Sequence, residues 1–575
     1  MIYPLNHVRN EIKTVLKTIL EKFGYNDEIK IEIPPSNLGD FAVPCFSFTS
    51  VIKQPPNKIA NELSKKYGET KLIEKVEAKG PYINFFLNRD AFKTSVFKSL
   101  IEKKDNYGYL EKNKLKVIVE HTSANPNGPL HVGRARNPII GDTIVRIFKA
   151  AGYNVESQFY LDDMGKQVAI LTWGVNNLDK KDIPKSKYNK PDHKTVGFYQ
   201  ISSKLLKENK EVSKEISKIV KKSEEGDKQT IEFVHKAYAP VLVGINDSLK
   251  QMNIIIDKYV PESNFVKDKS VNLVVEKLKK LKYCGKEEDA YYLDMEPFGI
   301  KGRNTNFFFL RKDGTTLYAT RDIAYHLWKA DHADLLINVL GEDHKLESKQ
   351  VEIALKLINA KKIPKAIFYS FVSLPGGKMS TRQARVVYVD ELIDECIALA
   401  YKEVKKRRGK ELTEKKMKEI AKIVGIGALR YNIIKVQPEK DMIFKWEEAI
   451  NFEGNSSPFI QYSHARACSI LSKKQEELKN VDATLLIHES EENLIKKLAS
   501  FPIIVEDACE GCKPHNIPLY LFEVASQFNK FYRDCPVLPE KNKEIRKARL
   551  FLVNATRIVL KNGLDILGIV APEEM

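Results

Sequence analysis

The sequence predicts a multidomain α/β protein in which a parallel-sheet domain lies between a small α+β domain and an all-α helix bundle. The chain has 575 residues, which is more than one hydrophobic core can organise, so about three domains are expected. Short apolar runs alternate with helical patterns in the middle of the chain, as in parallel sheets covered by helices. The last part shows 3.6-residue periodicity and almost nothing that resembles a strand.

The first region, residues 1–112, mixes helical and strand-like patterns. It begins with an amphipathic helical pattern and continues with short β-like runs, among them Lys30–Ile33 and Tyr82–Leu87. This mixture predicts a small α+β domain. Charged residues interrupt the apolar pattern of the N-terminus every few positions, so we expect neither a signal peptide nor a membrane span there.

The second region, residues 113–410, alternates candidate strands with helices, which predicts a Rossmann-type parallel sheet. The candidate strands are Leu115–Val119, Val155–Tyr160, Asp334–Leu340 and Ala366–Leu374. Ligands of such sheets bind beyond the carboxyl ends of the strands, near the point where the strand order reverses. A lysine-rich helical stretch at about 176–282 is too long for a simple crossover and predicts an inserted helical subdomain.

The third region, residues 411–575, is predicted to be an α-helix bundle. Helical periodicity is clear in Ile420–Ile426, Phe459–Leu471, Leu519–Tyr532 and Ile545–Leu560. A cluster of Gly, Asn, Ser and Pro at residues 454–458 reads as a connection between two of these helices.

The composition describes an ordinary globular protein with a basic surface. Hydrophobic residues make up 43% and charged residues 30% of the chain, and the formal net charge is +18. This charge favours a polyanionic partner such as nucleic acid, although solvated lysine-rich helices contribute to it. Seven mostly scattered cysteines predict a reducing, cytoplasmic location. Cys509 and Cys512 form a CxxC motif without a second pair, so no structural metal is expected.

The most informative stretch runs from Glu120 to Asp142 and reads EHTSANPNGPLHVGRARNPIIGD. It follows the first candidate strand, turns through several Pro and Gly residues, and opens into an apolar helical pattern that Gly152 should end. A strand, a tight turn and a helix N-terminus bind phosphate because free N–H groups and the helix dipole point at the anion. Gly133 allows a ligand to approach the backbone, and His131 can donate to a phosphate oxygen.

A second motif, Lys378–Arg382 with the sequence KMSTR, follows the last candidate strand and the glycine-rich Pro375–Gly377. A loop of this kind can bring an ammonium group to a triphosphate and later withdraw it. In this order, the two motifs resemble the paired signatures of class I aminoacyl-tRNA synthetases. Arg134 stands where a second His is usual and Arg382 where a final Lys is usual; arginine keeps the charge but changes the shape.

The resemblance to class I synthetases implies an ATP site built from the two motifs. The implied ATP-binding residues are Pro129, His131, Gly133, Arg134, Lys378, Met379, Ser380 and Arg382. Among them, His131, Gly133, Lys378 and Ser380 are implied to act in catalysis. The resemblance implies that ATP is used together with Mg²⁺, and that no protein nucleophile is needed.

Further motifs resemble the arginyl-tRNA synthetase family over essentially the whole chain. The stretch Ser123–Pro126 that leads to His131 is the most specific of them. The remaining motifs are Pro35–Phe41 and Gly80–Phe85 in the first region, and Gly427–Tyr431, Phe452–Asn455, Gln461–Arg466 and Gly563–Ile569 in the third. The third region therefore resembles an anticodon-binding helical domain, and the first resembles the N-terminal tRNA-contacting domain of this family.

An arginine pocket needs carboxylates and an aromatic wall, because a guanidinium presents five donors in a plane and no acceptor. Tyr318 and Asp322 are four residues apart and share one face if a helix starts at this point. Glu262 offers another carboxylate. The resemblance implies that the arginine-binding residues are Ser123, Asn125, Glu262, Tyr318, Asp322, Asp343 and His344. The predicted tRNA-binding residues are Arg430, Tyr462, Arg466, Arg549 and Arg557, although a plain solvated face explains Arg549 and Arg557 equally well.

The implied reaction attaches L-arginine to tRNA(Arg) through an arginyl-adenylate, with release of pyrophosphate and AMP. We expect a cytoplasmic monomer that binds neither DNA nor a membrane. Two alternatives remain open. A class I synthetase for cysteine or glutamate would share both signatures but should lack this helix bundle. A non-catalytic tRNA-binding paralogue would show decayed signatures, of which Arg134 and Arg382 are the only hints.

Overall fold

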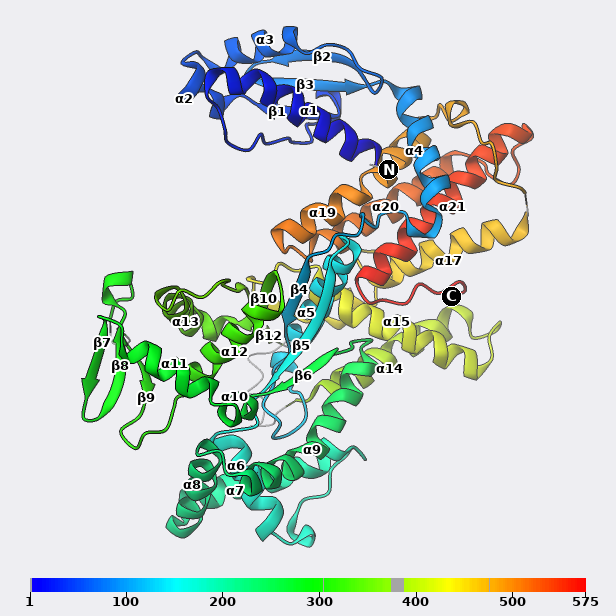
Figure 1. Cartoon of the computed structure of the whole chain (residues 1–575). Helices are drawn as coiled ribbons and strands as arrows, with labels where there is room; N and C mark the ends of the chain where they lie inside the picture. The colour runs from blue at the N-terminus through cyan, green and yellow to red at the C-terminus, as the bar shows by residue number, and fades with distance from the viewer. Residues whose placement is uncertain (1–2, 303–304, 374–386, 475) are drawn as a thin grey trace.

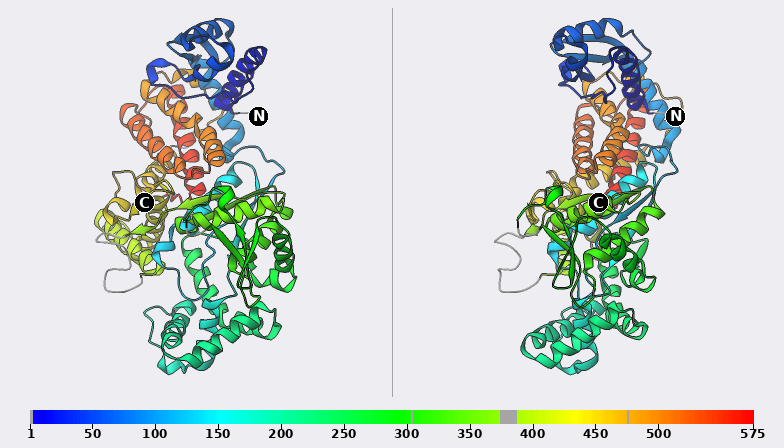
Figure 2. Two further views of the ribbon diagram at one scale, coloured as in Figure 1. Left: turned by 90° about the vertical axis from the view of Figure 1, so that its left-hand side faces the viewer. Right: turned by 60° about the vertical axis from the view of Figure 1, so that its left-hand side comes forward.

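The computed structural model describes residues 3–302, 305–373, 387–474 and 476–575. The molecule is elongated (Figures 1 and 2). The N-terminal domain lies at one end, followed by the C-terminal helices, the central parallel sheet and an inserted group of helices at the opposite end. None of the described helices is both long enough and apolar enough to cross a bilayer.

The N-terminal domain is a three-stranded antiparallel sheet with helices packed on it, so the predicted α+β character is confirmed. The strands are β1 (Phe41–Pro44), β2 (Ile73–Lys79) and β3 (Tyr82–Leu87), in the order β1-β3-β2. The helices are α1 (Pro4–Leu20), α2 (Thr49–Ile52), α3 (Pro56–Lys66) and α4 (Arg89–Lys103), which leads to the C-terminal helices. Val8, Ile12 and Leu16 form one buried face of α1, because residues four apart lie on the same side of a helix.

The central sheet has five parallel strands in the order β11-β10-β4-β5-β6. They are β4 (Lys116–Glu120), β5 (Asn154–Leu161), β6 (Lys258–Pro261), β10 (Leu335–Gly341) and β11 (Lys365–Tyr369). The chain moves from β4 to β5 on one side and later returns to β10 on the other, so the strand order reverses between β4 and β10. A crevice beyond the carboxyl ends of these two strands is therefore the expected ligand site.

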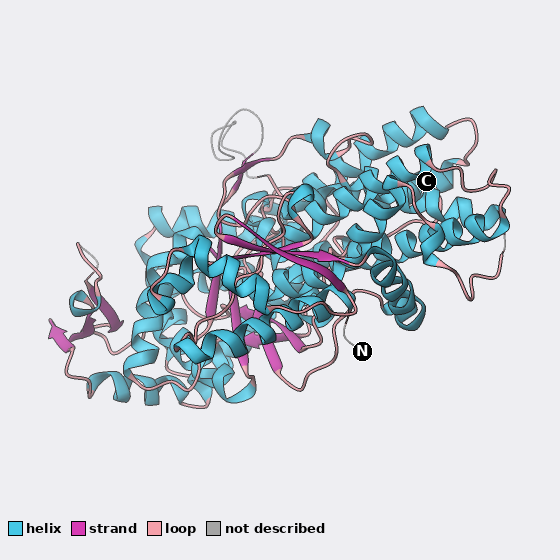
Figure 3. Cartoon of the chain, turned by 90° about the horizontal axis from the view of Figure 1, so that it is seen from above, coloured by secondary structure: helices cyan, strands magenta, loops and turns pink. Residues whose placement is uncertain are grey.

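Helices cover the sheet, as Figure 3 shows from above. They include α5 (Arg136–Ala150), α12 (Tyr318–His332) and α13 (Lys345–Leu357). Gly152 follows α5 with φ +89°, and a Cβ at this position would lie 2.1 Å from the carbonyl oxygen of Glu111. Glycine is therefore required both by the backbone angle and by the close approach, and the predicted end of this helix is confirmed.

The insertion contains four helices: α6 (Lys166–Asn177), α7 (Pro191–Glu208), α8 (Lys210–Glu224) and α9 (Lys228–Gln251). The stretch that we expected to be wholly helical also contains β6, which pairs with β5 at the edge of the main sheet. After it come α10 (Ser263–Lys267), α11 (Ser270–Lys279) and an antiparallel sheet of β7 (Cys284–Glu287), β8 (Ala290–Asp294) and β9 (Asn306–Leu310). These strands were not predicted from the sequence.

The C-terminal region is helical, as predicted. Its helices are α14 (Val389–Arg408), α15 (Glu414–Ile434), α16 (Trp446–Ala449), α17 (Ser457–Lys473), α18 (Glu489–Ala499), α19 (Phe501–Gly511), α20 (Asn516–Asp534) and α21 (Lys543–Ile566). Helix α14 packs against α15, although it lies before the predicted boundary at residue 410. A short parallel pair, β12 (Val372–Ser373) with β13 (Met442–Ile443), joins this region to the sheet domain.

Candidate active site

A cavity of about 670 Å³ opens at the carboxyl ends of β4, β5 and β10, where the strand order predicted a ligand site. Residues from the β4 turn, the β10 end, α12 and the end of β6 line it. Those used below are Glu120, Ser123, Arg134, Asn137, Tyr160, Asp162, Glu262, Tyr318, Asp322, His326, Asn338, Asp343 and His344. The cavity therefore brings together most of the predicted arginine-binding residues, and its size suits small substrates.

The turn after β4 is held in an unusual backbone conformation. Thr122 and Ser123 have φ +72° and +35°, a region that residues with a Cβ rarely adopt. The Thr122 N–H donates to Asn137 Oδ1 at 2.7 Å, and Ser123 Oγ accepts from the Tyr160 N–H at 3.1 Å. These bonds to α5 and β5 stabilise the turn and direct Ser123 to the cavity.

The first signature forms a 3₁₀ turn, residues 132–134, directly before α5. Arg134 lines the cavity. Pro129, His131 and Gly133 lie in the adjoining turn, outside this lining, and His131 is exposed. Asn125 is half-buried in the same turn and also lies outside the lining. Their assignment to ATP or arginine stays a prediction.

The second signature, with Lys378, Met379, Ser380 and Arg382, lies outside the described residues. The residues that flank it are described, and both flanks contact the first signature. The Val132 N–H donates to Val387 O at 2.9 Å, and the Val389 N–H donates to Leu130 O at 2.8 Å. Upstream, the buried Arg136 donates to Ser370 O at 2.7 Å.

The predicted relation between Tyr318 and Asp322 is confirmed, because α12 starts at Tyr318 and both side chains line the cavity. Tyr318 is 55% exposed at the mouth. The Asp322 carboxylate lies 3.1 Å from His326 Nδ1. Burial alone would raise the pKa of Asp322, but His326 and Lys329 hold it below its ordinary value.

Glu262 is buried at the end of β6 and forms an ion pair at 2.9 Å with the guanidinium of Arg321. Tyr160 Oη donates to the same Glu262 oxygen, Oε1, at 3.3 Å. The other oxygen, Oε2, is buried and has no hydrogen-bond donor among the described residues. A buried acceptor without a donor is costly, so a ligand that donates to Oε2 would be stabilised there.

The floor of the cavity is acidic. Burial raises the pKa of Glu262 to about 8, opposed by Arg321 and supported by the nearby Asp162. Burial also raises the pKa of Asp162 to about 6. Together with Glu120 and Asp322, these groups give a carboxylate-rich surface that is suited to a cation rather than to an anionic side chain.

Asp343 and His344 lie in a turn that follows β10, on the opposite side of the cavity from β6. Both are about half exposed. A hydrogen bond with Glu347 at 3.1 Å raises the pKa of His344 above its ordinary value. They are placed to border a ligand at the cavity wall.

Several residues at the cavity were not singled out from the sequence. They are Glu120, Asn137, Tyr160, His326, Lys329 and Asn338. Two of them carried a usable signal: Glu120 ends an apolar strand, and Asn338 interrupts the apolar run Leu335–Leu340. A polar residue in a buried strand needs a buried partner, which points to a polar network.

The structure corrects the prediction that Arg430 binds tRNA. Its side chain is fully buried and donates to Met252 O and Leu567 O at 2.7 Å, and to Asp142 at 2.5 Å. A guanidinium enclosed in this way joins α15, α9 and α5 and does not reach a nucleic acid. The sequence pattern indicated a cation on a helix but could not show which way it faces.

The other predicted tRNA-binding residues are closer to the surface. Arg549 pairs with Glu491 at 2.7 Å and Glu540 at 2.9 Å, so internal carboxylates already engage its guanidinium. Arg557 donates to Asn554 at 3.1 Å. Tyr462 and Arg466, by contrast, line a cavity of about 680 Å³ on the helix bundle, together with Phe459, Asn529 and Met575.

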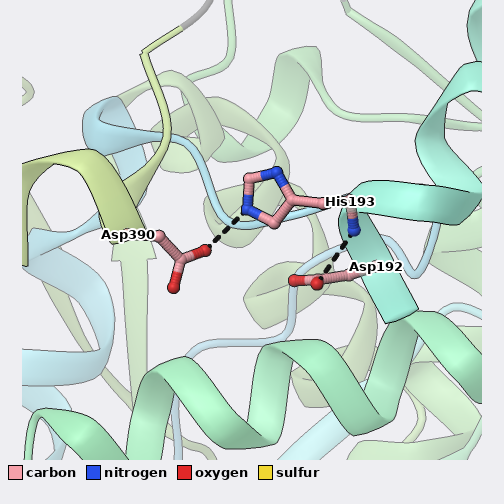
Figure 4. Close-up of side chains that lie close together, drawn as sticks. All are labelled: Asp192, His193 and Asp390. Carbon is pink, nitrogen blue, oxygen red and sulfur yellow. Dashed lines mark hydrogen bonds and ion pairs between the residues drawn. The ribbon is translucent and has the colours of Figure 1, made fainter. Parts of the chain in front are cut away.

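A cluster of possible metal ligands lies away from this cavity, between α7 and α14. Asp192, His193 and Asp390 are all buried, and His193 Nε2 lies 2.8 Å from Asp390 (Figure 4). It is the one such group among residues 3–302, 305–373, 387–474 and 476–575. Lys190 Nζ lies 2.6 Å from Asp390 and 3.8 Å from Asp192, so an ammonium group already supplies the positive charge.

The class of the protein follows from the parallel sheet, the turn after β4 and the comparison with known families. The description "tRNA synthetases class I (R), catalytic domain" matches residues 96–446, which is more than half of the chain. The catalytic region is therefore that of a class I aminoacyl-tRNA synthetase. The descriptions "Arginyl tRNA synthetase N terminal domain" and "DALR anticodon binding domain" match residues 6–87 and 460–575.

Similarity to individual proteins identifies the family within this class. The chain is 46% identical to an arginine–tRNA ligase of Methanocella arvoryzae over 92% of each chain, and 40% identical to that of Methanosarcina barkeri over 99% of each. The structure of Thermus thermophilus arginyl-tRNA synthetase superposes with a TM-score of 0.85 and 27% identity, over 99% of this chain and 100% of that one. The chain belongs to the arginyl-tRNA synthetase family. The resemblance is thus confirmed, and the alternative of a synthetase for cysteine or glutamate was wrong.

Proposed function

We infer that the chain is an ATP-dependent arginine–tRNA ligase that forms an arginyl-adenylate and transfers arginine to tRNA(Arg), releasing pyrophosphate and AMP. The observation that carries this inference is the carboxylate-rich cavity at the reversal point of the sheet, in a chain of the arginyl-tRNA synthetase family. A cationic substrate is the one such a cavity favours.

The cavity supports a division of roles between its two ends. Asp322 and Glu262 bind the guanidinium, with the ring of Tyr318 at the mouth as an aromatic wall. Ser123 and Asn125 hold the α-amino and α-carboxylate end of arginine or the nucleotide, and Asp343 and His344 border the bound substrates. The donorless Oε2 of Glu262 supports this orientation, because a guanidinium brings the missing donor.

Activation needs no protein nucleophile, because the carboxylate of arginine itself attacks the α-phosphate of ATP. The chain has to hold the reactants in line and stabilise the charge on the phosphates. His131, Gly133 and Arg134 do so at the N-terminus of α5, and Lys378 with Ser380 acts on the leaving pyrophosphate. Mg²⁺ accompanies the phosphates of ATP and takes few ligands from the protein.

The helix bundle binds the anticodon part of the tRNA. The cavity beside Tyr462 and Arg466 supports this proposal, since an aromatic ring and a guanidinium together form a surface on which a base can stack. We further propose that the enzyme acts as a cytoplasmic monomer on RNA and not on DNA. The net charge of +18 is in keeping with an RNA partner.

The direct test is aminoacylation of tRNA(Arg) by the purified chain with each of the twenty amino acids, in the presence of ATP and Mg²⁺. We expect charging with arginine alone. Charging with another amino acid would refute the pocket assignment, and no charging at all would favour the non-catalytic paralogue. An Asp322→Asn variant should raise the KM for arginine far more than the KM for ATP. Equal effects on both would remove Asp322 from the side-chain pocket.

A further inference from the structure

A buried network of polar contacts runs along the cavity, which its members Glu120, His326 and Asn338 also line. Lys329 Nζ lies 2.6 Å from Glu120 Oε2 and donates to Asn338 Oδ1 at 2.9 Å. Asn338 in turn lies 2.8 Å from His326 Nε2, and His326 Nδ1 lies 3.1 Å from the carboxylate of Asp322. The elements that carry these residues are α12, β4 and β10, whose Glu120 and Asn338 are paired neighbours in the sheet.

Lys329 fixes the direction of every hydrogen bond in this network. An ammonium group can only donate, so Asn338 accepts from Lys329 through Oδ1 and presents its NH₂ group to His326. His326 Nε2 must then accept, which leaves the proton on Nδ1. This proton points to Asp322, toward its backbone oxygen at 2.7 Å and its carboxylate. The network therefore selects one imidazole tautomer, and that tautomer donates to the cavity carboxylate.

The same ammonium group also reaches the other end of the cavity. Glu120 accepts a hydrogen bond from Ser123 Oγ at 3.3 Å through the oxygen that Lys329 does not use. Lys329 is 0% exposed, and it lies 4.1 Å above the ring of Tyr325. Its charge is thus neutralised by Glu120 and held in place by packing, in a site that water does not reach.

We propose that Lys329, Asn338 and His326 are positioning residues for arginine recognition, which keep Asp322 oriented for the guanidinium and Ser123 oriented for the other end of the substrate. This inference rests on the proposed function of the cavity. None of the three residues needs to touch arginine directly. They restrict the side chains of Asp322 and Ser123, which are proposed to contact arginine, so that less conformational entropy is lost when the substrate binds.

The test uses two histidines of α12 that make the same local contact. His326 Nδ1 and His332 Nδ1 each lie 2.7 Å from the backbone oxygen four residues earlier, but His332 is exposed and stacks on Trp328. His326→Phe should raise the KM for arginine about tenfold to a hundredfold, as expected for the loss of a hydrogen bond to a charged group. The KM for ATP should stay within about twofold, and His332→Phe should change neither.

Asn338→Leu is the second variant, because it removes the donor to His326 from another element and keeps the test valid if His326→Phe folds poorly. It should reproduce the rise in the KM for arginine. A merely structural role predicts a lower melting temperature with parallel changes in both KM values, and that result would overturn the inference. So would an unchanged KM for arginine in two folded variants. If the wild-type chain itself fails to charge arginine, the proposed function fails first, which separates the two outcomes.

Discussion

The amide of Val132, in the first signature, is hydrogen-bonded to the carbonyl oxygen of Val387 at 2.9 Å. Val387 is the first described residue after the segment 374–386, which carries the second signature. On the other flank, Ser370 is bonded to Arg136 at the start of α5. Both described flanks of this segment therefore lie beside the first signature, which supports the proposal that the two signatures act on one ATP molecule.

Lys378→Ala should slow formation of the adenylate by about two to three orders of magnitude, because an ammonium group that stabilises charge in the transition state contributes on this scale. Arginine-dependent exchange of pyrophosphate into ATP, with saturating tRNA(Arg), measures the step. The exposed Lys402 on α14 provides the control, and Lys402→Ala should exchange at the wild-type rate. Exchange near the wild-type rate in Lys378→Ala would remove this residue from the mechanism.

The raised pKa of Glu262 predicts that arginine binds more tightly as the pH rises. A cation prefers the ionised carboxylate, so arginine and a proton compete for Glu262, whose pKa is raised by burial to about 8. Between pH 6.5 and 8, affinity should rise by up to about tenfold per pH unit, and it should level off above the pKa. Calorimetric titration with arginine measures this slope.

Glu262→Gln should weaken binding and flatten the pH dependence in that range. Asp322→Asn should weaken binding but keep the slope, because the pKa of Asp322 lies below its ordinary value and the group is ionised throughout. A slope that persists in Glu262→Gln would assign the titration to another group. Asp162, with a pKa of about 6, would be the first to examine.

Arg430→Met should destabilise the fold by about 3–5 kcal/mol, because it leaves the buried Asp142 with Arg146 as its one cationic partner among the described residues and removes the donor to the carbonyl oxygens of Met252 and Leu567. Denaturant unfolding followed by circular dichroism measures the change. Arg533, which is 73% exposed and pairs with the adjacent Asp534, is the matched control; Arg533→Met should cost less than about 0.5 kcal/mol. Adding Asp142→Leu to Arg430→Met should recover part of the loss. A loss below that of the control would mean that the buried pair does not stabilise the fold.

Tyr462→Ala should raise the KM for tRNA(Arg) about fivefold to a hundredfold, the range expected for the loss of one base stacked on an aromatic ring. The KM for arginine at saturating tRNA should not change. Leu519 is the control, since both side chains are 41% exposed on helices of the same bundle. Leu519→Ala should leave the KM for tRNA unchanged, and equal effects of the two variants would contradict an anticodon contact at Tyr462.

The sequence was sufficient for the features that depend on local pattern. Long apolar runs with flanking turns predicted β4, β5, β10 and β11, and the spacing of Tyr318 and Asp322 predicted their common helix face. The ligand site followed from the reversal of strand order, since polar motifs came after each of these strands.

Features that depend on long-range packing could not be predicted from the sequence alone. The edge strand β6 has four residues, and its pairing with β5 decides its conformation more than its own pattern does. Arg430 and Lys329 read as ordinary helix cations, yet both are buried because Asp142 and Glu120 neutralise them from other elements. A single sequence does not show which distant carboxylate a cation will meet.

The contact between Lys190 and Asp390 restricts how the molecule can bend. Asp390 is 5% exposed, and its partners Lys190, His193 and Ser248 all belong to the insertion. Moving those helices away from α14 would leave the buried carboxylate of Asp390 without its cationic partner, at a cost of several kcal/mol. Because the neighbouring Val389 N–H donates to Leu130 O at 2.8 Å, a continuous line of contacts ties α7 and α9 to the turn that precedes α5.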